Sequence, residues 1–123
     1  MKETEILKKN YEFKTVFSKG KYYGGRILEV FVVKTNNNIN KIGIAVSTKA
    51  GNSVKRNKIK RLIRENYRAI EDRLLIGYNF VILWKKNTDT EEATFANIQK
   101  DIKYIFSKAK LIKEGYNNEE NTN

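Results

Sequence analysis

Cysteine, histidine and proline are all missing from the 123 residues of this chain. Without cysteine there is no disulfide framework, no thiol nucleophile and no cysteine-based metal site. Without histidine the chain lacks the most frequent general base and the most frequent metal ligand in proteins. Composition therefore excludes most familiar protein-based active sites.

Acidic residues are scarce beside basic ones: 14 Asp and Glu face 25 Lys and Arg, for a formal net charge of +11. A small domain this basic most often binds a polyanion, usually a nucleic acid. No apolar run approaches the ~20 residues of a membrane-spanning helix. The segment after Met1–Glu5 lacks the apolar core of a signal peptide, so we expect a cytoplasmic protein without membrane contact.

Hydrophobic periodicity and turn residues predict one α+β domain at residues 1–115, followed by a disordered polar tail at 116–123. The predicted elements are helices at 7–18, 53–73 and 89–112 and strands at 26–34, 41–48 and 78–84. The asparagine-rich turn at 36–38 suggests that the first two strands form an antiparallel hairpin. Residues 22–23 allow a further short strand or a strand edge, which gives the order α-β-β-(β)-α-β-α.

The helix predicted at 53–73 separates its cations from its apolar side chains. At ~100° per residue, one arc of about 140° holds a single set of polar residues: Arg56, Asn57, Lys60, Arg61, Arg64 and Arg68. The opposite side carries the residues expected to pack on the sheet: Ile59, Leu62, Ile63, Ala69 and Ile70. Like charges four residues apart repel one another, so a phosphate backbone is the natural partner of this arc.

A solvated charged face is the alternative interpretation of the same helix. It is disfavoured because nine Lys and Arg between Lys41 and Arg68 face one acid, Glu65, whereas ordinary exposed helices intersperse both signs. Arginine also fills four of the face positions, and its planar guanidinium binds phosphate in a bidentate way that lysine cannot.

Two ungapped segments carry a family resemblance: KIGIAVSTK at Lys41–Lys49 and GNSVKRNKIKRLIRE at Gly51–Glu65. Together they resemble the protein component of bacterial ribonuclease P. The segment YEFKTVFSKG at Tyr11–Gly20 resembles the first helix of that family. The resemblance extends over residues 7–112, nearly the whole chain.

The resemblance implies an α-β sandwich similar to domain 2 of ribosomal protein S5, with a left-handed βαβ crossover against the usual right-handed rule. It also implies a subunit that assists a catalytic RNA in removing the 5′ leader from precursor tRNA. Its partners would be ribonuclease P RNA and precursor tRNA, and no further protein would be required. Mg²⁺ would be held by the RNA and the substrate, with no metal on the protein and no catalytic side chain.

The resemblance divides the candidate site residues into two sets. Those expected to bind the RNA subunit are Lys49, Asn52, Lys55, Arg56, Asn57, Lys58, Lys60, Arg61, Arg64 and Arg68. Those expected to bind the 5′ leader are Phe13, Phe17 and Phe31, with Arg26 near Phe31. Aromatic side chains in a positive groove are typical of single-strand binding, and Phe13 and Phe17 share a helix face at this spacing. A plain core role is the alternative for both rings.

Other functions fit the sequence less well. A structural ribosomal or general RNA-binding protein of the same fold would need only charge, not the Arg56-Asn57 core in these surroundings. A helix-turn-helix module needs a short helix before the basic one, where this chain has a predicted strand. A metal-dependent nuclease needs clustered carboxylates, and the local acidic cluster, Asp89–Glu92, suits the start of the last helix better.

Overall fold

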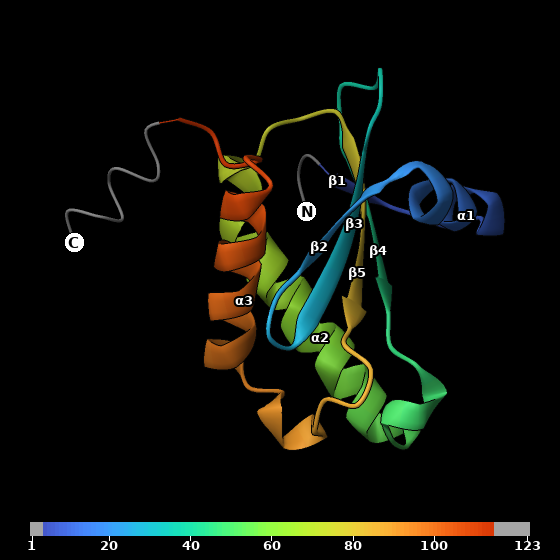
Figure 1. The fold of residues 1–123 in the computed structure, drawn as a ribbon, viewed down its shortest axis with the longest axis vertical. Helices are drawn as coiled ribbons and strands as arrows, with labels where there is room; N and C mark the ends of the chain where they lie inside the picture. Colours follow the sequence, from blue (N-terminus) through green and yellow to red (C-terminus); the bar gives the residue numbers. More distant parts are fainter. Residues whose placement is uncertain (1–3, 115–123) are drawn as a thin grey trace.

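A five-stranded mixed sheet organises residues 4–114, which are the residues that the computed structural model describes (Figure 1). The strands are β1 (Thr4–Ile6), β2 (Lys21–Gly24), β3 (Leu28–Lys34), β4 (Asn40–Ala45) and β5 (Tyr78–Trp84), in the spatial order β1-β4-β5-β3-β2. The helices are α1 (Asn10–Lys19), α2 (Ser53–Ile70) and α3 (Phe95–Lys108), with short 3₁₀ turns η1 (Thr48–Ala50), η2 (Glu71–Arg73) and η3 (Thr90–Glu92).

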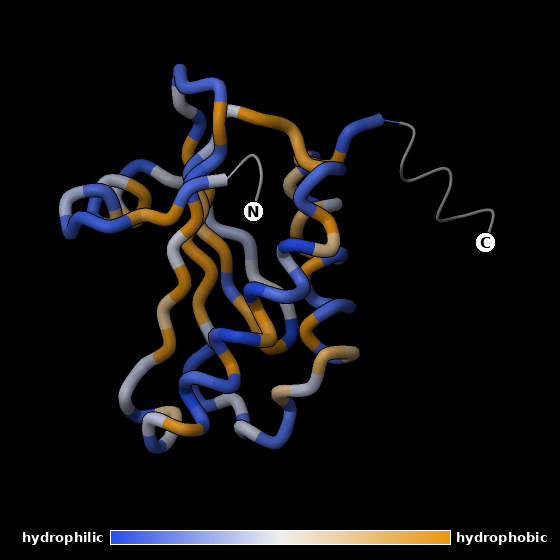
Figure 2. The backbone as a smooth tube through the Cα atoms, turned by 180° about the vertical axis from the view of Figure 1, so that it is seen from behind, coloured by the Kyte–Doolittle hydropathy of each residue, from blue (hydrophilic) through white to orange (hydrophobic). Residues whose placement is uncertain are grey.

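Helices cover the sheet unequally: α2 and α3 lie on one face and α1 lies on the other (Figure 1). Side chains alternate along β3, so Val30 and Val32 enter the large core under α2 and α3, while Phe31 and Val33 point toward α1. Figure 2 shows this concentration of hydrophobic positions along the strands. The predicted α+β class and the alternation of helices with strands are confirmed.

The hairpin predicted between residues 26–34 and 41–48 is wrong, because β5 lies between β3 and β4. Strand β5 pairs antiparallel with β3 and parallel with β4. Its run from Phe80 to Ile82 is fully buried, and a strand with both faces buried belongs at the centre of a sheet. The short strand at 22–23 is present as part of β2, whereas β1 was missed because three residues show no period.

The helices also differ from prediction in their bounds and packing: α1 begins at Asn10 rather than at residue 7, and α3 ends at Lys108 rather than at 112. The last helix does not open at Asp89; that side chain accepts from the Glu91 N–H and caps η3, and α3 begins after Thr94, whose Oγ1 accepts from the Asn97 N–H at 3.1 Å. Ala69 of α2 is exposed rather than packed on the sheet. Tyr67, two residues earlier on the same helix, is fully buried in the core.

The β4-α2-β5 unit is the βαβ crossover of this fold, since β4 and β5 are parallel neighbours joined through α2. Its left-handed sense and the likeness to ribosomal protein S5 stay predictions. The tail predicted at 116–123 and the domain end at 115 lie outside the described residues. Across residues 4–114, no helix combines the length and the apolar character needed to cross a bilayer.

Candidate nucleic-acid interface

The start of α2 is held by the turn that precedes it. Asn52 is the N-cap, and its Oδ1 accepts from the Lys55 N–H at 2.9 Å. Gly51 adopts φ 149°, a conformation that side chains disfavour, and its carbonyl accepts from Arg56 Nε at 3.2 Å. Asn52 therefore has a structural role through its oxygen, while its amide nitrogen has no hydrogen-bond partner among residues 4–114.

The exposed side of α2 is a continuous basic surface, here called the basic face and defined by Arg56, Asn57, Lys60, Arg61, Arg64 and Arg68. Ile59, Leu62, Ile63 and Ile70 are buried on the opposite side, as the helical period predicts. Within residues 4–114, Arg61 is the one member with a carboxylate partner, an exposed pair to Glu65 at 3.1 Å. Such a pair contributes little, so the basic face keeps nearly all of its charge.

The remaining predicted RNA-binding residues flank this face. Lys55 and Lys58 are exposed but lie outside the arc of the basic face, and Lys49 is exposed on η1, before the helix. The structure therefore collects the ten predicted residues at α2 and the turn before it, with six of them on one face.

Lys60 and Arg64 do more than face solvent, which the sequence did not indicate. Both are half-buried and line a cavity of about 160 Å³ together with Phe13 of α1 and Gly43 of β4. A Cβ on Gly43 would lie 2.4 Å from the Phe13 ring, so only glycine lets this ring rest on the strand. The basic face and the α1 side of the sheet therefore meet at the β1-β4 edge.

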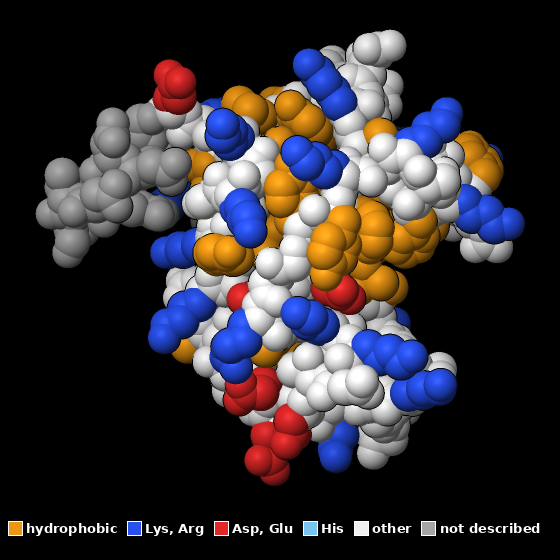
Figure 3. Space-filling model, viewed as in Figure 1, with side chains coloured by type: hydrophobic (Ala, Val, Ile, Leu, Met, Phe, Trp, Pro, Cys, Tyr) orange, Lys and Arg blue, Asp and Glu red, His pale blue; other side chains and the backbone are white. Residues whose placement is uncertain are grey.

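Three aromatic rings cluster on the α1 side of the sheet, and we call Phe17, Tyr22 and Phe31 the aromatic trio. Phe17 and Phe31 are edge-to-face with centroids 5.2 Å apart, and Tyr22 and Phe31 are 5.3 Å apart. Phe17 is 40% exposed and Tyr22 is 48% exposed. Figure 3 shows an apolar patch on the surface beside α1. Exposed rings that already touch one another form a platform on which bases can stack.

Tyr22 was expected at a strand edge and was not among the residues predicted to bind the leader. Its position follows from strand register, because β2 pairs with β3 and places Tyr22 directly opposite Phe31. The Tyr22 hydroxyl donates to a Glu29 carboxylate oxygen at 2.7 Å, and this bond raises the pKa of Tyr22. The hydroxyl is thus protonated at neutral pH, and its hydrogen bond fixes the orientation of the ring.

Phe13 and Arg26 behave differently from the trio. Phe13 is half-buried and packs with Leu7, Val16 and Val81 in the small core under α1. The structure does not bring Arg26 to the aromatic rings: its guanidinium pairs with Glu92 of η3. That hydrogen bond raises the pKa of Arg26.

A buried carboxylate, Asp101 of α3, explains where Arg26 lies. Its two oxygens accept from the backbone N–H groups of Arg26, Ile27 and Leu28 at 2.8–2.9 Å. A Cβ on Gly25 would lie 2.5 Å from this carboxylate, so the turn needs glycine there. The β2-β3 turn is thereby fixed against α3, away from the trio.

The α1 side also has a polar anchor. Glu12 accepts from the Lys9 and Lys8 N–H groups and pairs with Lys41 of β4 at 3.2 Å. These bonds, first of all the one from Lys9, lower the pKa of Glu12. Among residues 4–114 no group of three or more acidic side chains is placed to hold a metal ion. The predicted absence of a metal on the protein stays a prediction.

Comparison with known proteins agrees with this geometry. Residues 1–110 match the family model described as Ribonuclease P. The chain is 36% identical over 114 residues to the Ribonuclease P protein component of Natranaerobius thermophilus, covering 93% of this chain and 97% of that protein. It is 42% identical over 114 residues to the corresponding protein of Clostridium acetobutylicum, covering 91% and 93%. The solved RNase P protein of Staphylococcus aureus aligns with a TM-score of 0.78 at 28% identity, covering 88% of this chain and 97% of that one.

Proposed function

The chain belongs to the ribonuclease P protein family, and from this premise we propose that it helps a catalytic RNA to remove the 5′ leader from precursor tRNA. Membership places it in an endoribonuclease holoenzyme of tRNA processing, with ribonuclease P RNA as its partner. The division of work between its two surfaces is inferred from their chemistry.

The basic face of α2 is proposed to bind the RNA subunit. The observation that carries this assignment is that the face keeps its cations without neutralising carboxylates, apart from the Arg61–Glu65 pair, among the described residues. Phosphates supply the missing negative charge, and each neutralised phosphate releases counterions. Arg56 is held by the Gly51 carbonyl, which reduces the side-chain entropy lost when its guanidinium meets a phosphate.

The aromatic trio is proposed to bind the single-stranded 5′ leader. Stacking of a base on an aromatic side chain contributes ~1–3 kcal/mol and tolerates any sequence. Phe17 lies on the same helix as Phe13, which borders the cavity that Lys60 and Arg64 line. This continuity supports a path in which one face holds the RNA subunit while the leader crosses the neighbouring surface.

The protein is proposed to position RNA and to leave the chemistry to the RNA subunit. Mg²⁺ would be bound by the RNA and the substrate. Burial raises the pKa of Tyr67 to about 12, so this phenol is neutral and inaccessible near neutral pH. Tyr22 is likewise protonated because its hydroxyl donates to Glu29. Neither tyrosine suits a role as general base.

The decisive experiment is single-turnover cleavage of a precursor tRNA by a bacterial ribonuclease P RNA at low Mg²⁺, with and without the protein. Cleavage restored at the mature 5′ end would support the proposal. Tight RNA binding without restored cleavage, with a cognate RNA, would indicate a general RNA-binding protein instead. The triple variant Lys34→Ala, Lys100→Ala and Lys108→Ala is the control for the loss of three positive charges, and it is matched to the replacement of Arg56, Lys60 and Arg64 by alanine. It removes three exposed charges away from the basic face and should restore cleavage like the wild type.

A further inference from the structure

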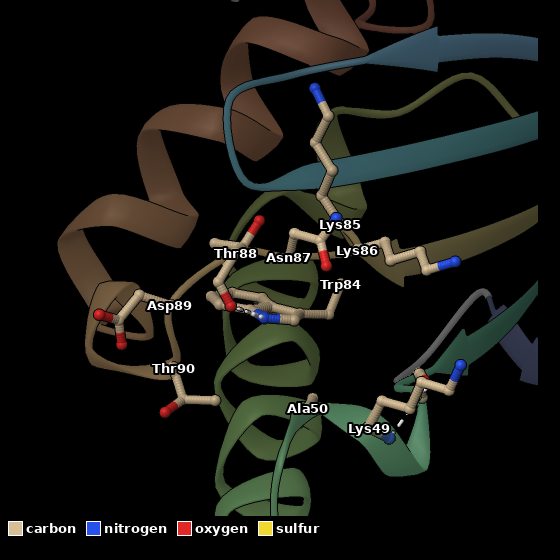
Figure 4. Close-up of a pocket in the computed structure, with 10 residues that line it drawn as sticks. Lys49, Ala50, Trp84, Lys85, Lys86, Asn87, Thr88, Asp89 and Thr90 are labelled. Atoms are coloured by element: carbon tan, nitrogen blue, oxygen red, sulfur yellow. Dashed lines mark hydrogen bonds between the residues drawn. The ribbon is translucent and has the colours of Figure 1, made fainter.

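A cavity of about 250 Å³ lies beyond the carboxyl ends of β4 and β5 (Figure 4). The two strands are parallel, so their ends share one edge of the sheet, where crevices in such sheets commonly bind ligands. Its walls come from Trp84, Ala50 of η1 and the loop before η3. Trp84 belongs to the core under α2 and α3, whereas the aromatic trio lies on the opposite face.

The walls of this cavity are held in place without a ligand. The Trp84 indole N–H donates to the Thr88 carbonyl at 3.3 Å, and the Thr88 N–H donates to the Lys85 carbonyl at 3.2 Å. Asn87 turns the loop with φ 68°, a left-handed conformation that asparagine tolerates. Trp84 is only 5% exposed, so the core fixes its ring, and a small part of the ring surface borders the cavity.

Several polar groups in the cavity have no partner within the described chain. The hydroxyls of Thr88 and Thr90 make no hydrogen bond among residues 4–114. Lys49 and Lys86 have no carboxylate partner there, and Figure 4 shows both side chains extending to the same side of the cavity. Lys85 differs, because its ammonium donates to the Gly25 carbonyl at 3.0 Å. The cavity therefore combines an aromatic wall, free hydroxyls and two available ammonium groups.

We propose that this cavity binds one nucleotide turned out of an RNA strand. The base would lie against Trp84 and Ala50, its edge would meet the threonine hydroxyls, and its phosphate would lie near Lys49 and Lys86. The volume is below the range of sites for drug-sized ligands, which suits a single base. A free anion would need the ammonium groups alone and would leave the aromatic wall unused.

The position of the cavity favours RNA as the source of the nucleotide. Lys49 is three residues before Asn52, the N-cap of α2, so the cavity is next to the start of the basic face. An RNA strand that is bound to the basic face can therefore place a neighbouring base in the cavity. That this strand belongs to ribonuclease P RNA, rather than to another RNA, rests on the proposed function.

The first test uses the free protein and the four nucleoside 5′-monophosphates. Trp84 is the only tryptophan of the chain, so its indole N–H is a single, assigned NMR probe and its fluorescence reports one site. We expect a saturable shift with nucleotides and none with inorganic phosphate at equal concentration. Equal shifts with phosphate, or no saturable shift with any nucleotide, would overturn the proposal.

Two variants separate binding from folding. Ala50→Leu fills the cavity and should weaken nucleotide binding by at least about fivefold, whereas Ala69→Leu, at an exposed position of α2 that does not line the cavity, should not. Thermal unfolding of Ala50→Leu checks its fold. Thr90→Val keeps the shape and removes one hydroxyl, so it should weaken binding without changing stability. Unchanged nucleotide affinity in both cavity variants would refute the site.

A second arm measures the affinity of ribonuclease P RNA for the wild type and for Thr90→Val. Weaker binding of the RNA would assign the nucleotide to that partner. Because the nucleotide titration uses the protein alone, it can succeed even if cleavage is not restored. The experiments therefore distinguish a cavity that binds no nucleotide from a protein that does not restore cleavage.

Discussion

The two faces of the sheet differ in how completely they are covered. The face under α2 and α3 holds a continuous core, in which Phe80 packs against the rings of Tyr67 and Phe106. The face under α1 has three buried members within residues 4–114, namely Leu7, Val16 and Val81, and leaves the aromatic trio partly exposed. Exposed apolar clusters on a folded domain usually serve binding, so one face stabilises the domain and the other remains open to a partner.

Stability measurements would test this contrast most strongly. Phe80→Ala should lower the free energy of unfolding by about 3–5 kcal/mol, because Phe80 is fully buried among aromatic rings. Phe17→Ala should cost far less, about 1 kcal/mol, because its ring is already partly exposed. Urea denaturation of both variants measures the difference. Equal losses would mean that the α1 face is an ordinary core.

The salt dependence of RNA binding would test the basic face of α2, the helix that covers the better-packed face of the sheet. Replacing Arg56, Lys60 and Arg64 by alanine should reduce the slope of log K against log salt by about 0.9 for each phosphate that is no longer neutralised. Filter binding or fluorescence anisotropy with ribonuclease P RNA, at several salt concentrations, measures the slope. An unchanged slope would remove the basic face from the interface.

Leader recognition would test the open face directly. Phe17→Ala should weaken binding of a leader-bearing precursor tRNA to the holoenzyme by ~1–3 kcal/mol and leave binding of mature tRNA nearly unchanged. Tyr22→Phe is the comparison variant for Phe17→Ala, because it keeps an aromatic ring available for stacking and removes only the hydrogen bond to Glu29. Equal losses for precursor and mature tRNA would indicate damage to the fold rather than loss of stacking.

Alkaline unfolding would distinguish the faces through Tyr67, which is buried at the α2 face and hydrogen-bonded to Thr4 Oγ1 at 2.9 Å. Its pKa is raised to about 12 in the folded chain from 10.0, so the unfolded chain loses the proton first. Stability should therefore fall as pH rises from 10 toward 12, by about 2 kcal/mol from this group. Urea midpoints of Tyr67→Phe should fall less over that range. Parallel curves would exclude this linkage.

Local sequence patterns predicted much of the fold because they need only short-range information. The period of α2 separated Ile59 and Ile63 from Arg56 and Lys60, and the structure confirms that division. Strand β5 was predicted at its observed bounds, since a short apolar run after Gly77 is typical of a buried strand. The start of α3 was missed because Asp89 and Thr94 are both good N-caps, and only one of them opens the long helix.

Part of the candidate site could likewise be predicted from the sequence, and part of it was placed only by the tertiary structure. The basic face lies on one helix, so its composition was visible in the spacing of its residues. The trio joins α1, β2 and β3, and Tyr22 enters it only through the register of β2 with β3. Arg26 was expected beside Phe31, but the buried carboxylate of Asp101, 75 residues away, fixes its turn elsewhere.

The charge, the helix and strand periods and the residues of the basic face all follow from neighbours a few positions apart, so the order of amino acids is enough to establish them. Long-range packing was needed to place β5 between β3 and β4, to rest Phe13 on Gly43 beside Lys60, and to close a cavity with Trp84. Strand order and cavity walls arise from contacts between distant segments, which no local pattern encodes. Here the burial of the most apolar strand outweighed the local preference for a hairpin.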